Sequence, residues 1–317
     1  MGAVWRPFLI LCLAAALAVP FAACGSDDGE VNLDDVARQR QAEQKRERRI
    51  AELEERLARL KERERPARQP AADGLPGFDK LAGNLDGKVG ATVGPPGGEV
   101  TSMGDLRSGS AWSTIKVAIA MRILEKAGGP GGLSAAQRSQ IERAITASDN
   151  GAAMELFRSL GSTSAAAAAV TEVLREAGDD STQVSDQGRG SFSPYGQTEW
   201  PLEAQHRFTA ALAAGCFGDA ASRRYVLGLM GRVSSDTWGL GSAGVPAKWK
   251  GGWGPGTDGR YIARQMGVLD YGARQLVITV AAVPSDGQFS SAQTMATQVA
   301  KWIAARGRRL ARAPRGC

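Results

Sequence analysis

The chain has 317 residues, of which 43% are hydrophobic and 23% are charged, so it is long enough for one sizeable core and an appendage. Its net charge of +6 is modest, and the last residues, ARGRRLARAPRGC, hold much of the excess. A basic end of this kind fits an anionic membrane surface or an acidic wall polymer, or it serves solubility alone. We expect no nucleic-acid partner.

The N-terminal segment MGAVWRPFLILCLAAALAVPFAAC has a basic start at Arg6, then an apolar run, then small residues. The apolar run is short and a highly polar segment follows, which indicates a signal peptide over residues 1–23 rather than a membrane span. Its end, FAAC, resembles the lipobox of bacterial lipoproteins. That resemblance implies that Cys24 is acylated and anchors an extracytoplasmic protein to the membrane. The alternative is an ordinary secretory signal with an incidental cysteine.

Residues 24–77 are predicted to form a charged helical stalk and a linker. Arg, Lys and Glu dominate the stalk, and the linker RPARQPAADGLPGF ends the helix with prolines and glycines. The pattern allows either a short, self-associating coiled coil or a single solvated helix with many ion pairs. The apolar residues that recur with heptad-like spacing are Ile50, Leu53, Leu57 and Leu60.

One folded domain of the α+β class is expected over residues 78–317. GKVGATVG and GEVTSMGDL indicate two strands joined by a PPGG turn, and helical periodicity follows from Trp112 to about Met230. AKWKGGW, RYIARQMGVLD and QLVITVAAVPS indicate three more strands, and SAQTMATQVAKWIAARG indicates a closing helix. Strands at both ends around a helical middle predict one sheet built from both termini, with an inserted helical subdomain.

Ser113 and Lys116 stand three residues apart at the start of the apolar helix AWSTIKVAIAMRIL. Residues at i and i+3 lie on one face of a helix, so the two side chains are within hydrogen-bonding reach. A serine hydroxyl becomes a good nucleophile when a neighbour takes its proton, and a lysine whose pKa is lowered by burial can do so. Alone, this pair also fits an ordinary solvated helix.

Two further motifs follow in order along the chain. ITASDNGAAMELF and VPAKWKGGWGP place polar and glycine residues at a helix boundary and at a strand end, namely Ser148, Asp149, Asn150, Lys250, Gly251 and Gly252. Each motif has a simple structural explanation, because Ser and Asp cap helices and Gly allows a bend or a close approach. Together, SxxK, SDN and a KGG in place of K-[ST]-G resemble the signature of serine β-lactamases and penicillin-binding proteins, in the class A β-lactamase-like branch.

This resemblance implies a three-layer αβα fold with an antiparallel sheet, and a serine hydrolase whose ligand is a β-lactam or a peptidoglycan stem peptide. It implies that Ser113 is the acyl-accepting nucleophile, that Lys116 is its base, and that Ser148 relays a proton to the leaving nitrogen. Asn150 would bind the substrate amide, and Lys250 would attract the substrate carboxylate. The main-chain N–H groups of Ser113 and Trp253 would form the oxyanion hole beside Gly251 and Gly252.

Two departures from the family pattern bear on activity. Gly251 stands where the family has a hydroxyl that helps to hold the substrate carboxylate, so one directional hydrogen bond is lost. The ExxLN motif, whose glutamate hydrolyses the acyl-enzyme in class A enzymes, is absent. Asp186, Glu199 and Glu203 are the carboxylates in the corresponding loop, and we expect Glu199 and Glu203 to be surface residues rather than a deacylation base. The chain is therefore expected to hydrolyse β-lactams or to be acylated by them slowly, and the alternative is a non-catalytic or weakly active wall- or partner-binding module.

The remaining cysteines and histidine carry weaker expectations. Cys216 and Cys317 form an even pair in an exported protein, which allows a disulfide, although a buried free Cys216 fits equally well. His206 is expected on a helix surface. We expect no cofactor and no metal, because the sequence contains no metal-ligand cluster, no HExxH and no phosphate loop ending in GK[ST].

Overall fold

The computed structural model describes residues 75–314 and, further upstream, residues 41–42, 45–46, 48–49 and 52. The chain divides into two compact units, residues 1–68 and 69–317. In the first unit the described residues are helical and exposed, as the stalk composition predicts. The signal peptide, Cys24 and the heptad-like leucines lie outside the described residues, so the lipid anchor, the self-association and the domain boundaries stay predictions. None of the described helices is long and apolar enough to cross a membrane.

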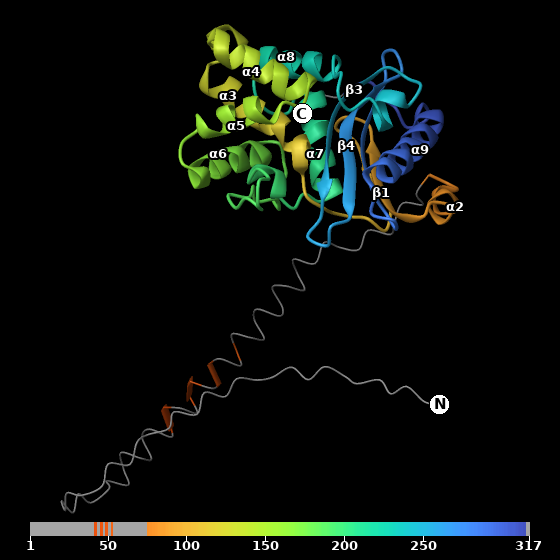
Figure 1. Ribbon diagram of the computed structural model, residues 1–317, viewed down its shortest axis with the longest axis horizontal. Helices are drawn as coiled ribbons and strands as arrows, with labels where there is room; N and C mark the ends of the chain where they lie inside the picture. Colours follow the sequence, from red (N-terminus) through yellow and green to blue (C-terminus); the bar gives the residue numbers. More distant parts are fainter. Residues whose placement is uncertain (1–40, 43–44, 47, 50–51, 53–74, 315–317) are drawn as a thin grey trace, which may run out of the picture. The chain divides into compact units, whose positions relative to one another are not determined.

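The second unit is built on an antiparallel sheet of five strands in the order β2-β1-β5-β4-β3 (Figure 1). The strands are β1 (Gly87–Gly94), β2 (Thr101–Gly104), β3 (Ala247–Pro255), β4 (Tyr261–Asp270) and β5 (Gln275–Pro284). Both ends of the domain contribute to the sheet because β1 pairs with β5 along its whole length, from Gly87 opposite Pro284 to Gly94 opposite Val277. The predicted sheet from both termini is confirmed, and β3 is one of its edge strands.

Helices cover both faces of the sheet (Figure 1). On one face, Ile278 and Val280 of β5 pack against Val299 and Ile303 of α9 (Phe289–Gly307). The short α2 (Phe78–Gly83) joins this layer through the edge-on contact of Phe78 with Trp302, at 5.7 Å between ring centroids. On the other face lies α7 (Leu202–Ala214), whose first residue accepts a hydrogen bond from the β5 side chain Thr279. This arrangement confirms the predicted three-layer αβα fold.

The helical subdomain between β2 and β3 surrounds α3 (Lys116–Lys126), which is buried except on one narrow side. α3 packs against its neighbours α4, α5, α6 and α8. The other elements of the subdomain and its connections are η1 (Trp112–Ile115), η2 (Pro130–Gly132), α4 (Ala135–Thr146), α5 (Asn150–Arg158), α6 (Thr163–Glu176), η3 (Tyr195–Gln197), α8 (Ala220–Met230) and η4 (Gly239–Ser242). Because α3 begins directly after η1, its buried first turn lies beside Ser113.

His206 differs from its expected place on a helix surface. The side chain is fully buried in α7, and Nδ1 lies 3.1 Å from the Thr92 hydroxyl of β1. Burial lowers the pKa of His206 to about 3, so the ring is neutral at physiological pH. The expectation was wrong because α7 is covered on the side of His206 by the sheet, which the local sequence EAQHRF does not reveal.

Cys216 follows α7 and is disulfide-bonded. This bond excludes the alternative of a free buried thiol at this position. Cys317, the predicted partner of Cys216, lies outside the described residues, so their pairing stays a prediction.

Candidate active site

Ser113 lies in the tight turn η1, which leads the chain from the sheet into α3. Trp112 holds this turn with a left-handed backbone φ of 48°, a conformation that non-glycine residues adopt only when their surroundings enforce it. Its ring is buried and packs edge-on against Phe192, with 5.1 Å between ring centroids. The Ser113 side chain itself is half-buried, so a substrate can reach the hydroxyl.

A chain of hydrogen bonds stabilises η1. Gln205 of α7 donates through Nε2 to the Thr114 hydroxyl at 2.8 Å, and that hydroxyl donates to the carbonyl of Ala111. Gln205 in turn accepts a hydrogen bond from the guanidinium of Arg264 in β4 at 2.9 Å. Neither Gln205 nor Arg264 was predicted as a site residue, since nothing in their local sequence shows that they connect to η1.

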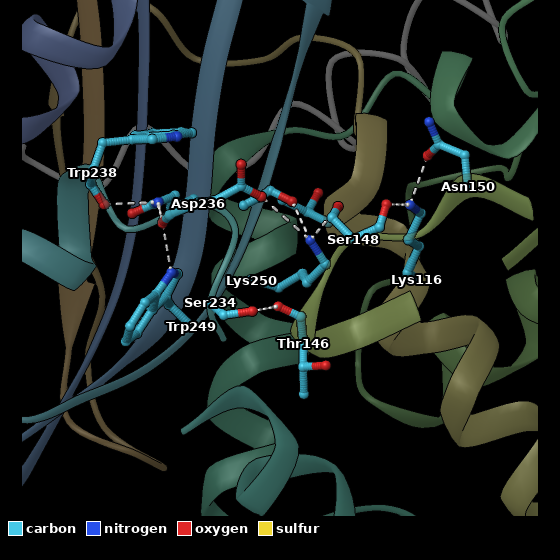
Figure 2. Close-up of polar contacts among 12 residues, drawn as sticks. Lys116, Thr146, Ser148, Asn150, Ser234, Asp236, Trp238, Trp249 and Lys250 are labelled. Atoms are coloured by element: carbon cyan, nitrogen blue, oxygen red, sulfur yellow. Dashed lines mark hydrogen bonds and ion pairs between the residues drawn. The ribbon is translucent and has the colours of Figure 1, made fainter. Parts of the chain in front are cut away.

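Lys116 is the first residue of α3, and its side chain is only 1% exposed. Its Nζ atom donates hydrogen bonds to the carbonyl of Ser148 at 2.6 Å and to Oδ1 of Asn150 at 2.7 Å (Figure 2). Burial and, after it, the charge of Lys250 lower the pKa of Lys116 to about 6, and Asp236 and Asp149 oppose the shift. The amine is therefore largely neutral at pH 7 and has a lone pair that can accept a proton.

The segment Ser148–Asp149–Asn150 connects α4 to α5. Asp149 is the N-cap of α5 and accepts a hydrogen bond from the main-chain N–H of Ala152 at 3.0 Å, which is the helix-cap role expected from its chemistry. Ser148 adopts a left-handed φ of 57°. This turn directs the Ser148 carbonyl to Lys116 and the Ser148 hydroxyl to Lys250.

Lys250 extends from the edge strand β3 and is fully buried. Its Nζ atom donates to the Ser148 hydroxyl and to the carbonyl of Gly251, each at 2.8 Å. It also lies 3.6 Å from Oδ2 of Asp236 (Figure 2). Burial lowers the pKa of Lys250 to about 8, and Asp236 opposes the shift, so this amine remains mostly protonated at pH 7.

Asp236 is a site residue that sequence analysis did not identify. It is 5% exposed, and its Oδ2 atom has no hydrogen-bond partner among the described residues. Its main-chain carbonyl accepts hydrogen bonds from Trp249 at 2.8 Å and from Gln265 at 2.9 Å, which fix the loop against the sheet. The one signal in the sequence was indirect, since the missing side chain at Gly251 leaves a space that another group can fill.

The glycines of the KGG motif allow two close approaches to β3. A Cβ atom at Gly252 would lie 2.8 Å from both the carbonyl oxygen of Ala111 and the main-chain nitrogen of Ser113. A Cβ atom at Gly251 would lie 2.6 Å from Oδ2 of Asp236. Gly252 therefore allows β3 to lie against η1, and Gly251 makes room for the Asp236 carboxylate.

Trp253 is placed differently from the other residues of the third motif. Its ring is 43% exposed and stacks on Phe289 at the start of α9, with 4.2 Å between centroids. The ring thus packs on the α9 layer, and only its main chain shares the strand that approaches Ser113. Trp112, by contrast, packs its ring directly over the glycine-lined part of β3 at Gly254.

None of the three carboxylates considered for deacylation forms a hydrogen bond or ion pair with Lys116 in the described part of the chain, although the main chain of Glu199 pairs with Ser110. Glu203 is exposed and forms an ion pair with Arg207 at 2.9 Å, and Asp186 accepts a hydrogen bond from Gln187 at 3.0 Å. Glu199 is exposed, and its charge acts on Arg264 rather than on Lys116. The charged groups that act on Lys116 are Lys250, Asp236 and Asp149. Among residues 75–314, no cluster of His, Cys, Asp or Glu could hold a metal ion.

The structure thus brings the residues of all three motifs to one place. Lys116 and Lys250 both contact Ser148, although Ser148 and Lys250 are 102 residues apart in the chain. Gly252 lies against Ser113. The arrangement combines the half-buried Ser113, a neutral amine, a protonated amine, and Ser148, whose carbonyl contacts the first amine and whose hydroxyl contacts the second. Such a set can move a proton away from Ser113 and on to a leaving group.

Comparisons with known proteins identify this fold. No family model and no curated protein sequence matches the chain. Among solved structures, a β-lactamase from Sphaerobacter thermophilus is 20% identical with a TM-score of 0.57, and the match covers 73% of this chain and 97% of that one. A β-lactamase from Streptosporangium roseum is 18% identical with a TM-score of 0.58 over 73% of this chain and 97% of its own. The protein PBP-A is 18% identical with a TM-score of 0.59, covering 74% and 95% of the two chains.

Proposed function

The domain has the serine β-lactamase/penicillin-binding protein-like fold, and we propose that it is a serine acyl-transfer enzyme with Ser113 as its nucleophile. The observation that carries the proposal is the buried Lys116, which follows Ser113 by one turn, donates through Nζ to the Ser148 carbonyl and to Asn150, and has its pKa lowered to about 6 by burial. Solved structures of similar fold are named as β-lactamases and as PBP-A, which supports a β-lactam or a peptidoglycan stem peptide as the acyl donor.

The reaction follows from the contacts of each group. The Ser113 oxygen attacks the carbonyl carbon of the substrate, and its proton passes to Nζ of Lys116, directly or through water. A tetrahedral oxyanion forms and is stabilised by main-chain N–H donors of Ser113 and Trp253. The bond from the carbonyl carbon to the leaving nitrogen then breaks, and that nitrogen takes a proton through the Ser148 hydroxyl, which Lys250 polarises.

Hydrolysis of the acyl-enzyme is expected to be slow. A water molecule that attacks the ester on Ser113 needs a base near Ser113, whereas Glu203 pairs with Arg207, Asp186 accepts a hydrogen bond from Gln187, and Glu199 is exposed. An acyl group would then stay on Ser113, as in a penicillin-binding protein rather than an efficient β-lactamase.

The test is acylation of the full chain by benzylpenicillin and, separately, by its neutral methyl ester, each at millimolar concentration and followed by intact-protein mass spectrometry. We expect one adduct per chain that persists for hours and maps to Ser113. Ser113→Ala and Lys116→Ala should abolish it, while Ser164→Ala, on an exposed face of α6, should leave it unchanged.

The possible results separate the alternatives. No adduct from either reagent would overturn the proposal and favour a non-catalytic binding module on the same fold. Fast turnover of nitrocefin by the wild type, abolished in Ser113→Ala, would keep the nucleophile but contradict slow deacylation.

A further inference from the structure

The part of the site beside Lys250 bears on which substrates Ser113 accepts. If Lys250 attracts a substrate carboxylate, its positive charge must be available to that carboxylate. Here Oδ2 of Asp236 lies 3.6 Å from Nζ of Lys250, and both side chains are buried, with exposed fractions of 5% for Asp236 and 0% for Lys250. Because a buried pair is screened little by solvent, Asp236 cancels much of the field of Lys250.

Asp236 also occupies the space into which a side chain at Gly251 would extend. A side chain at Gly251 would begin 2.6 Å from both Cβ and Oδ2 of Asp236, so a Thr or Ser at this position and the present Asp236 conformation exclude each other. Gly251 and the present conformation of Asp236 therefore depend on each other. Together they place an acidic oxygen beside Lys250, where the family has a neutral hydroxyl donor. A hydroxyl can donate a hydrogen bond to a carboxylate, whereas an aspartate carboxylate only accepts and repels it.

The charge around the site agrees with this geometry. At pH 7 Lys116 is largely neutral and Lys250 carries one positive charge, which Asp236 faces. The nearby arginines are occupied, since Arg143 pairs with Asp149 at 3.3 Å and Arg264 donates to main-chain carbonyls such as that of Trp200 at 3.0 Å. An incoming carboxylate thus meets no unpaired cation among these groups.

We propose that Asp236 makes the Ser113 site select acyl donors whose end beside Lys250 is uncharged or positive, such as an amide, an ester or an amine, and disfavour donors with a free carboxylate there. The Oδ2 atom of Asp236 lies 3.6 Å from Nζ of Lys250 and accepts no hydrogen bond among the described residues, so it is an acceptor that suits an N–H donor of the substrate. This inference rests on the proposed acyl transfer to Ser113 and specifies its substrate class.

The test compares two reagents that differ only in this charge, benzylpenicillin and its methyl ester. Second-order acylation rate constants are measured by intact-protein mass spectrometry at pH 7. For the wild type we expect the ester to react at least as fast as the acid. In Asp236→Asn the ratio of the acid rate to the ester rate should rise by about tenfold to a hundredfold, the factor set by one charged hydrogen bond gained and one repulsion removed.

A second variant restores the family pattern. Asp236→Gly combined with Gly251→Thr should shift the ratio toward the acid in the same way, because glycine removes Cβ and the carboxylate, the atoms that a side chain at Gly251 would meet. Asp258→Asn removes the same charge from an exposed pair with Arg260 and should leave the ratio unchanged.

The outcomes distinguish this inference from the proposed function. A wild type acylated tenfold faster by the acid than by the ester, or an unchanged ratio in folded Asp236→Asn, would overturn the selectivity and leave acyl transfer standing. No adduct on Ser113 from either reagent, in the wild type and in Asp236→Asn, would overturn both. The ratio of acid to ester acylation rates in the wild type tests the proposed selectivity even if a variant does not fold.

Discussion

At the scale of single residues, two lysine amines with different protonation states share the Ser148 turn. Lys116 donates to the Ser148 carbonyl and Lys250 to its hydroxyl, yet their pKa values are lowered to about 6 and about 8. Burial is the main cause for both, and Lys116 feels the additional repulsion of Lys250. The difference supports the proposed roles of Lys116 as base and Lys250 as cation near neutral pH, because titratable neighbours whose pKa values are pushed apart serve different steps.

The pH dependence of acylation tests this assignment. A lysine base works only when it is deprotonated, so the acylation rate of wild type by a neutral ester should rise with pH through about 6 and level off. In Lys250→Met the rising limb should move to higher pH, because the cation that lowers the pKa of Lys116 is gone while Asp236 and Asp149 still raise it. The measurement is the rate constant from pH 5 to 9; a limb that stays in place or moves to lower pH would contradict the role of Lys250.

At the scale of elements, the site depends on how closely β3 approaches η1. The Gly252 main chain packs against Ala111 and Ser113 at a distance that leaves no room for a side chain. Alanine is acceptable to a strand backbone, so the requirement for glycine comes from the neighbouring turn and not from β3 itself. This close approach sets the position of Lys250 relative to Ser113.

Gly252→Ala should therefore reduce the acylation rate by about a hundredfold, because the turn and the strand must separate by a few tenths of an ångström or more. Gly83→Ala, where no atom lies within 4 Å of the new methyl group, is the matched control and should react at the wild-type rate. Acylation of Ser113 by the penicillin ester is the measurement, with thermal unfolding recorded beside it. A Gly252→Ala protein with wild-type kinetics would show that the approach is not needed.

At the scale of the whole molecule, Arg264 connects the sheet to α7 and to the segment that precedes Ser113. Its guanidinium is fully buried in β4 and donates to Trp200 O, Ser110 O and the side chain of Gln205, the last of which supports η1. Burial lowers the pKa of Arg264 to about 10, so the group stays charged at neutral pH. One side chain thus links β4, α7 and the segments before Ser113 and α7.

Arg264→Met should lower the free energy of unfolding by about 2–4 kcal/mol, because several buried acceptors lose their donor. It should also slow acylation, since the support of η1 through Gln205 is lost. Arg260→Met removes an exposed arginine and should change stability by less than about 0.5 kcal/mol. Guanidinium denaturation measures both, and equal stabilities of the two variants would refute the role of Arg264.

The sequence by itself determined the features that depend on local order and pattern. The bounds predicted for β1 match the observed strand, the closing helix lies within α9, and Asp149 caps α5 as its chemistry suggests. Alternation, helix periodicity and capping involve neighbours in the chain, so they can be read without knowing the fold. The order of the three motifs added the αβα architecture through its resemblance to a known family.

Only the tertiary structure decided which groups surround these motifs. Asp236, Gln205 and Arg264 reach the site from a loop, a helix and a strand that are distant in sequence, and His206 is buried because the sheet covers α7. The lowered pKa of Lys116, and the opposing effects of burial and Asp236 on the pKa of Lys250, follow from packing and from residues that are distant in sequence. Burial and electrostatic fields arise from the packing of separate segments, and a local stretch of sequence contains no record of that packing.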